Sequence, residues 1–271
     1  MPAVQIESHS LHYEISGDGE PLLLLHGLGS SGLDWGEQVP AFSKRYQVIT
    51  PDLAGFGRSD RLTARYSIAE YAKDIFRLLD HLRIDHCHLL GYSMGGAVAF
   101  QMAADMPRRI SSLIILNSLP SFVLDNFAKR REYFLRCLIV RLFGMKPLAR
   151  LVTKRLLPKD EHRMIGEKMA ARYELNDRKS YLAALKALVG WSVSDRLDVL
   201  TMPVLMISAD QDYTPVEEKR KYVEQMPNAR LLVIKDSRHA TPVDQAEVFN
   251  KVVLDFLGEA SAAVSRIDLT R

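Results

Sequence analysis

The sequence predicts an α/β fold with a mostly parallel sheet, and two observations carry this prediction. Short apolar runs that suit buried strands alternate with segments of helical spacing, both before residue 119 and after residue 200. Such alternation indicates βαβ units, whose strands lie parallel. The stretch between the two parts shows helical segments without strands. We therefore predict one core domain from residues 1–119 and 200–271, with residues 120–199 inserted as a helical cap.

Seven strands are predicted from apolar runs bounded by turn residues, at 11–15, 21–25, 46–50, 87–90, 112–116, 203–207 and 230–234. The run at 21–25 is apolar throughout, which suits a strand covered on both faces. A helix over 67–82 follows from its apolar spacing, with Ser67 as N-cap. The last helix is expected over about 242–257, with Thr241 as cap and Pro242 at its first position. Beyond Gly258 the periodicity is weak, and we expect this tail to fray.

Composition bounds the class of protein. Of 271 residues, 47% are hydrophobic, which is enough for a large core. The two cysteines, Cys87 on a strand and Cys137 on an apolar helix, are interpreted as core residues and not as a disulfide. The first residues lack the basic start and apolar core of a signal peptide, and no apolar run could span a membrane. These features predict a cytoplasmic protein.

The most informative motif is Gly-Tyr-Ser-Met-Gly-Gly at residues 91–96, between a predicted strand and a predicted helix. A serine hydroxyl is a weak nucleophile in water, but it becomes effective on a strained turn beside a base and backbone donors. Small residues at the ends of the motif let the strand and the helix approach each other. Ser93 is therefore the candidate nucleophile.

An activated serine needs a histidine, and the histidine needs a carboxylate to fix its tautomer. His239 follows the last predicted strand, so it should lie at the same sheet edge as Ser93. Two aspartates, Asp210 and Asp212, follow the strand at 203–207. We favour Asp212, which lies further into the loop. Asp210 is then a residue of the turn or a neighbour of the site. Alternatively, Asp210 and Asp212 are both loop residues whose side chains bond their own backbone.

Acyl transfer also requires donors for the developing oxyanion. The backbone N–H of Met94 lies at a helix N-terminus, where the helix dipole helps. A second donor is expected from the glycine-rich loop at 26–31, with the N–H of Leu28 as candidate. This loop is not a phosphate-binding P-loop, because the required lysine is absent.

These motifs together resemble the α/β-hydrolase superfamily, in its serine esterase and lipase-like branch. The resemblance rests on His26-Gly27 with Gly29 and Trp35, the segment 52–59, the motif at 91–96, Asp212 with Pro215, and His239, in that order, and it covers residues 4–258. It implies an eight-stranded, mostly parallel sheet with an antiparallel second strand and a cap over the active site. Serine at the motif, where some relatives carry aspartate, implies ester-type chemistry.

The predicted cap is strongly basic. Residues 126–190 hold sixteen Lys and Arg against six Asp and Glu, a net charge of +10, which leaves −7 for the rest of a chain whose total is +3. The stretch 133–143 is apolar with interspersed arginines. It could line an acyl pocket, contact an anionic membrane, or simply present a solvated basic face. Single arginines that bind an anion are a further alternative.

The sequence thus predicts a serine hydrolase that cleaves a carboxylic ester with a lipophilic acyl group, through Ser93, His239 and Asp212. The alternatives are a C–C bond hydrolase, a lactonase or an elimination enzyme with the same triad, or a non-catalytic binding protein of this fold. The expected partners are a small ester or lipid and, through the cap, a membrane surface. Nucleic acid is not expected. No cofactor is expected, and His81, His86 and His88 lack the partners of a zinc site.

Overall fold

The computed structural model describes residues 2–6, 9–61 and 66–268. Its centre is an eight-stranded sheet in the order β1-β2-β4-β3-β5-β6-β7-β8, in which β2 pairs antiparallel with both β1 and β4 and the remaining pairs are parallel. The predicted fold class is therefore confirmed. The strands are β1 (Ala3–Ile6), β2 (His9–Ser16), β3 (Glu20–Leu25), β4 (Tyr46–Pro51), β5 (Cys87–Tyr92), β6 (Ile110–Leu116), β7 (Val204–Ala209) and β8 (Ala229–Ile234).

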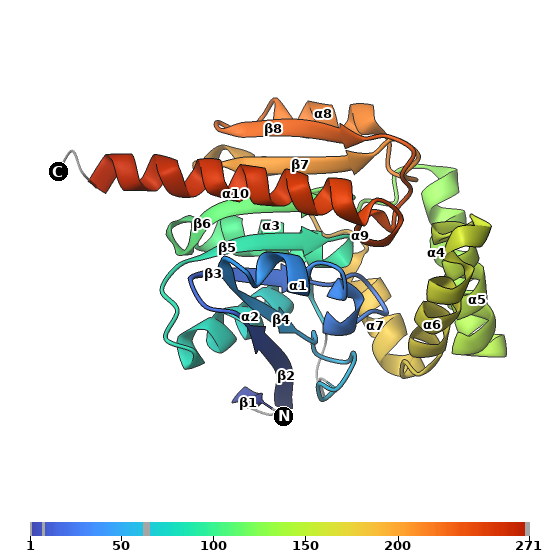
Figure 1. Cartoon of the computed structure of the whole chain (residues 1–271). Helices are drawn as coiled ribbons and strands as arrows, with labels where there is room; N and C mark the ends of the chain where they lie inside the picture. Colours follow the sequence, from blue (N-terminus) through green and yellow to red (C-terminus); the bar gives the residue numbers. More distant parts are fainter. Residues whose placement is uncertain (1, 7–8, 62–65, 269–271) are drawn as a thin grey trace.

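Helices cover both faces of the sheet (Figure 1). Side chains alternate along β3, so that Leu23 and Leu25 pack into one apolar layer while Leu22 and Leu24 pack into the other. The first layer is shared with α2 (Ile68–His81), α3 (Met94–Asp105) and α8 (Val216–Val223), and the second with α1 (Val39–Phe42) and α10 (Ala246–Asp268). The apolar run predicted to be covered on both faces is buried in this way.

Four helices lie between β6 and β7 and stand at one end of the sheet, beside its carboxyl edge (Figure 1): α4 (Phe127–Phe143), α5 (Met145–Leu156), α6 (Arg163–Glu174) and α7 (Arg178–Leu188). The chain enters and leaves this group side by side. The N–H of Phe122 donates to the carbonyl of Trp191 at 2.9 Å, and the N–H of Gly190 donates to the carbonyl of Phe122 at 3.1 Å. In the described part of the chain, no helix has the length and apolar character needed to cross a bilayer.

The C-terminal helix differs from its prediction in three ways. It is broken at Gln245 into a short helix, α9 (Thr241–Asp244), and the long α10, because the backbone of Gln245 leaves the helical region. Thr241 does not cap it: this residue is already helical, and its hydroxyl donates to the carbonyl of Arg238. Finally, α10 continues ten residues beyond Gly258, to Asp268, where the weak periodicity had suggested fraying.

Candidate active site

Ser93 occupies the sharp turn between β5 and α3. Its backbone has φ 54° and ψ −117°, a conformation that residues with a side chain rarely adopt. Its carbonyl oxygen accepts hydrogen bonds from the Ser118 hydroxyl at 2.7 Å, from the Gly96 N–H at 2.9 Å and from the Ala97 N–H at 3.2 Å. The surrounding structure thus fixes a strained turn that presents the serine hydroxyl at the sheet edge.

The small residues around the serine are required by close backbone contacts. A Cβ atom at Gly91 would lie 2.4 Å from the carbonyl oxygen of Gly95, and one at Gly95 would lie 2.2 Å from that of Leu25. Neither contact is tolerable for a carbon atom. Glycine at these positions therefore allows the close approach of the strand and the helix, as the sequence indicated.

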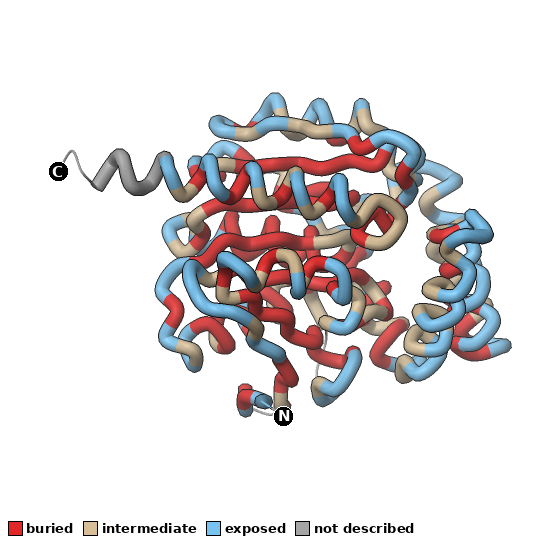
Figure 2. Tube along the Cα trace, viewed as in Figure 1, coloured by how far each residue is buried: buried red, intermediate tan, exposed pale blue. Residues whose placement is uncertain are grey.

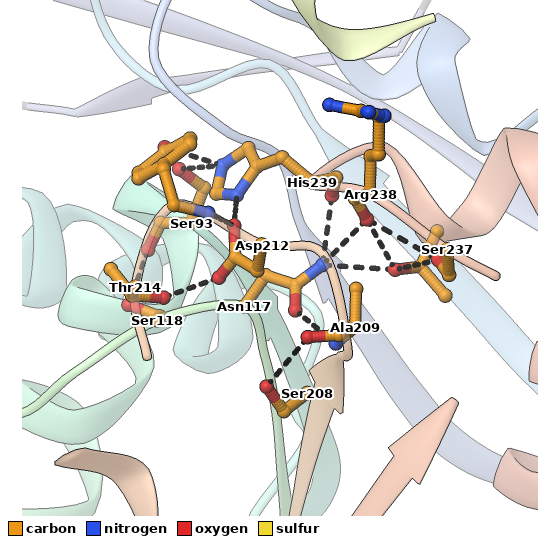
Figure 3. Close-up of polar contacts among 12 residues, drawn as sticks. Ser93, Asn117, Ser118, Ser208, Ala209, Asp212, Thr214, Ser237, Arg238 and His239 are labelled. Atoms are coloured by element: carbon orange, nitrogen blue, oxygen red, sulfur yellow. Dashed lines mark hydrogen bonds and ion pairs between the residues drawn. The ribbon is translucent and has the colours of Figure 1, made fainter. Parts of the chain in front are cut away.

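The structure brings Ser93, His239 and Asp212 into one chain of hydrogen bonds (Figure 3). His239 Nε2 lies 2.9 Å from Ser93 Oγ, and His239 Nδ1 lies 2.7 Å from Asp212 Oδ1. Because an ionised carboxylate only accepts, Nδ1 carries the proton and Nε2 is free to accept the proton of the serine. This is the geometry of a nucleophile, a general base and a carboxylate that orients the base.

Of the two candidate aspartates, the structure places Asp212 beside the histidine. Asp210 accepts a hydrogen bond from the Ser237 N–H at 3.1 Å, which ties two loops together, and no described hydrogen bond joins it to His239. The alternative that Asp210 is part of the turn therefore fits the geometry. The position deeper in the loop lets the Asp212 side chain turn back toward His239.

A buried lysine, which the sequence reasoning missed, pairs with Asp212. Neither side chain of the Lys219–Asp212 pair has exposed surface, and the Lys219 ammonium donates to Asp212 Oδ2 at 2.7 Å, to Ser208 Oγ at 2.8 Å and to the Thr214 carbonyl at 3.1 Å. Its three N–H groups thus meet three acceptors. Only the position of Lys219 on α8, four residues after Pro215, hints at this role in the sequence.

The charge of Asp212 is set by these neighbours. Burial by itself raises the pKa of Asp212, but the charges and hydrogen bonds of His239 and Lys219 outweigh it and hold this pKa well below the usual aspartate range. Burial lowers the pKa of Lys219, and Asp212 partly offsets this shift. Asp212 is therefore a carboxylate at neutral pH, able to hold the histidine in one tautomer.

Asn117, at the end of β6, was also missed and joins the loops that carry the two triad partners (Figure 3). Its side-chain N–H₂ donates to the carbonyl of His239 and to the hydroxyl of Thr241, both at 2.9 Å, while its carbonyl oxygen accepts from the N–H of Ala209 at 2.8 Å. One buried amide thus fixes the histidine loop against the end of β7. Such positioning is not visible in a sequence pattern.

The two predicted oxyanion donors belong to segments that flank the nucleophile. Met94 is the first residue of α3 and directly follows Ser93. The loop before Leu28 lies against the serine, because a Cβ atom at Gly27 would be 3.4 Å from Ser93 Cβ. Among the described hydrogen bonds, none engages the N–H of Leu28 or Met94. Both amides therefore remain available to an oxyanion.

His26 holds this loop in place and is not a second base. It is fully buried, its Nδ1 lies 2.8 Å from the Gly27 carbonyl, and its Nε2 accepts from the Leu53 N–H at 2.9 Å. Burial lowers the pKa of His26, although the charge of Asp52 opposes the shift. A neutral imidazole that bridges two loops is consistent with a structural role.

Ser93 and His239 open into a cavity of about 370 Å³ beneath the four inserted helices. Its walls are mostly apolar and come from α4, α5, α6 and α7 and from the segments that flank them: Leu119, Phe122, Val123, Leu124, Ala128, Tyr133, Val152, Leu156, Met169, Leu185, Leu188 and Val189. Polar side chains, including Glu132, Arg136 and Arg155, also line the cavity. A substrate with a substantial apolar part fits such a lining.

The described residues contain no cluster of three or more His, Cys, Asp or Glu that could hold a metal ion. The three histidines considered for zinc do not converge: His88, for instance, bonds Ser112 Oγ at 2.8 Å within the sheet.

The chain matches the family model described as alpha/beta hydrolase fold over residues 20–246. Curated relatives include proteins assigned as the carbamate hydrolase RutD, from Stutzerimonas stutzeri (30% identical, over 94% of this chain and 99% of the relative) and from Variovorax paradoxus (32%, over 93% and 97%). A similar solved structure is a thermophilic esterase from Thermogutta terrifontis, with TM-score 0.86 and 26% identity over 96% and 99% of the two chains. An enol-lactonase from Burkholderia xenovorans (TM-score 0.88, 24% identity, 95% and 100%) shares the fold.

With an eight-stranded sheet and a serine turn of this kind, the chain belongs to the alpha/beta hydrolase fold family. Its relatives support the activity of a hydrolase.

Proposed function

We propose that the protein hydrolyses carboxylic esters with an apolar acyl group through an acyl-enzyme formed on Ser93. The observation that carries this proposal is the continuous relay from Ser93 through His239 to Asp212, which opens into an apolar cavity. The relay makes the serine nucleophilic, and the lining selects the substrate.

In the first half of the reaction, Ser93 Oγ attacks the acyl carbon while His239 Nε2 accepts its proton. The N–H groups of Leu28 and Met94 stabilise the oxyanion, each of them worth about 3 kcal/mol by analogy with other oxyanion donors. The C–O bond to the alcohol then breaks, and the alcohol leaves with the proton from His239. In the second half, His239 takes a proton from water, the hydroxide attacks the acyl-enzyme, and the acid is released as Ser93 regains its proton.

The same attack by Ser93 can cleave carbamates and lactones, and the names of several relatives support these substrates as alternatives. Two are assigned as carbamate hydrolases, and a structure of 26% identity is described as an N-acyl homoserine lactone degrading enzyme. The volume and apolar lining of the cavity favour an ester of medium chain length over a small polar carbamate. Lactones with an apolar tail are the second candidate.

The test is a series of p-nitrophenyl esters of increasing acyl length, run beside a phenyl carbamate and an acylated lactone. We expect kcat/KM to rise with chain length until the cavity is filled, by about a factor of four per buried methylene. A fluorophosphonate probe should label the wild type and not the Ser93→Ala variant. Equal labelling of both proteins would refute the serine mechanism, whereas a maximum at acetate would refute the apolar acyl group.

A second hydroxyl competes with Ser93 for the histidine. Tyr213 Oη lies 2.7 Å from His239 Nε2, and the centroids of the two rings are 4.1 Å apart, with the ring planes tilted by 31°. Burial raises the pKa of Tyr213 far above its usual value, so this group stays protonated and can donate. Since Nε2 has a single lone pair, a proton from Tyr213 keeps it from the serine.

We therefore expect Tyr213→Phe to raise kcat/KM for short esters by up to about fivefold, the worth of one hydrogen bond. Steady-state kinetics of the variant and the wild type measure this. The matched control is Tyr222→Phe, a tyrosine on α8 outside the described cavity, which should leave the rate unchanged. A tenfold fall in Tyr213→Phe would instead make the hydroxyl part of the catalytic machinery.

A further inference from the structure

Helix α4 exposes a row of large apolar side chains, here named the outer stripe: Phe127, Phe134, Leu138 and Leu142. Their exposed fractions are 78%, 62%, 37% and 64%. Spacings of seven, four and four residues place them on one side of an α-helix. Only Cys137 and Val140 of this helix are buried. In Figure 2 the helices at the carboxyl edge of the sheet are coloured largely as exposed or intermediate, whereas the central strands are largely buried. An exposed row of large apolar side chains, interrupted only at the turn that carries Arg130 and Arg131, marks an interaction surface.

The outer stripe is flanked by positive charge. Arg130, Arg131 and Arg141 are exposed on the same helix, and no described ion pair involves any of them. No acidic residue occupies an exposed position of α4, since its single acid, Glu132, pairs with Arg136 and Arg155 instead. The next helix, α5, also exposes a leucine between basic residues, at Arg150, Leu151 and Lys154.

From this arrangement we propose that the outer stripe of α4 is a docking surface for an anionic lipid bilayer. A helix with aromatic and leucine side chains on one face, bordered by arginines, lies in the interface of a membrane with its apolar face among the acyl chains. The arginines then meet lipid phosphates. The net charge of +10 on residues 126–190, against −7 elsewhere, orients the molecule with this side toward an anionic surface.

A second copy of the chain fits the outer stripe less well. A symmetric contact between two stripes would bring the arginines of each copy toward those of the other, with no exposed acid on α4 to compensate. An acidic protein partner would need to present a groove to this row, because none of the three main cavities found in the described residues is lined by a residue of the outer stripe. A fluid bilayer needs no such complementarity.

The inner side of α4 forms a wall of the cavity that holds Ser93, through Ala128, Glu132, Tyr133 and Arg136. A bilayer on the outer stripe would therefore lie one helix diameter from the site, about 10 Å. If the proposed ester hydrolysis holds, a lipophilic substrate could pass from the bilayer into the cavity. The docking itself requires no turnover, so the two proposals can fail independently.

Co-sedimentation with vesicles tests the docking, using the full chain with Ser93→Ala so that no lipid is cleaved. Vesicles of phosphatidylcholine alone are compared with vesicles that also contain phosphatidylglycerol. We expect binding to the mixed vesicles that is largely lost in about 1 M salt, where the screening length is about 3 Å. Arg131→Gln with Arg141→Gln should weaken binding about 25-fold, or about fivefold for each charge.

The apolar contribution is tested by Phe134→Ser with Leu138→Ser, which should abolish vesicle binding at any salt concentration. The matched control is Val248→Ser, which removes an equally exposed apolar side chain from α10 and should bind as the parent protein does. Binding of the stripe variant equal to the parent, or no binding of the parent to mixed vesicles, would overturn the proposal. A dimer in light scattering that the stripe variant loses would assign the surface to a second copy and overturn it as well.

Discussion

Replacing Asp212 by asparagine is expected to lower kcat about 10⁴-fold. Because the change also removes the buried anionic partner of Lys219, we expect the free energy of unfolding to fall by about 3–5 kcal/mol. The carboxylate accepts from His239 Nδ1 at 2.7 Å, whereas an amide can donate to that nitrogen and stabilise the other tautomer. Nε2 would then carry the proton and could not accept one from Ser93. Rapid-quench or steady-state kinetics on a p-nitrophenyl ester, with circular dichroism to verify folding, measure the loss.

Asp210→Asn is the matched control, since it changes the same group two residues away. This side chain accepts one hydrogen bond from the Ser237 N–H, which an amide oxygen can also accept. We expect kcat within about threefold of the wild type, because a neutral acceptor still forms the bond. A large loss of kcat in the Asp210→Asn variant, together with little change of kcat in the Asp212→Asn variant, would reverse the assignment of the two aspartates.

The second large effect is expected on stability, from Lys219→Met. This change leaves Asp212 buried without its ammonium partner, and removal of one member of a buried ion pair costs about 3–5 kcal/mol. Denaturant unfolding monitored by tryptophan fluorescence gives the difference. The free energy of unfolding should fall by this amount, and kcat should fall with it to the extent that Asp212 turns away from His239.

Lys221→Met provides the comparison on the same helix, because Lys221 is exposed. Its loss should change the free energy of unfolding by less than about 0.5 kcal/mol. If Lys219→Met proved as stable as the wild type, the pair would contribute no net stability and the hydrogen bonds of Thr214 and His239 would suffice to hold Asp212.

The strands were predicted well because each one is a mainly apolar run, and most of them are largely buried in the sheet. All seven expected strands occur, at bounds that differ by a few residues. The eighth, β1, followed only from the family resemblance, because four residues at a sheet edge carry little pattern of their own. The final helix was predicted at the right place, but its break at Gln245, where the backbone leaves the helical region, was not predicted.

For the site, the order of Ser93, Asp212 and His239 along the chain was sufficient to nominate them. The residues that contact these three side chains could not be predicted from the sequence in the same way. Asn117 is far from its partners in sequence, whereas Lys219 lies within 11 residues of its own partners, but nothing in the surrounding sequence marks either residue. Tyr213 is adjacent to Asp212, yet its approach to His239 depends on how the loop turns.

By itself, then, the sequence determined the fold class and nominated the candidate nucleophile, because local patterns of apolar residues and glycine encode strands and tight turns. The tertiary structure alone decided which aspartate meets the histidine, that a buried lysine neutralises it, and that the apolar row of α4 faces outward. These results depend on how separate segments turn and pack against one another, and even Lys219, 7 residues from Asp212, reaches it only through the turn of the loop between them. The energy of a buried charge or an exposed leucine is defined only once its neighbours are in place.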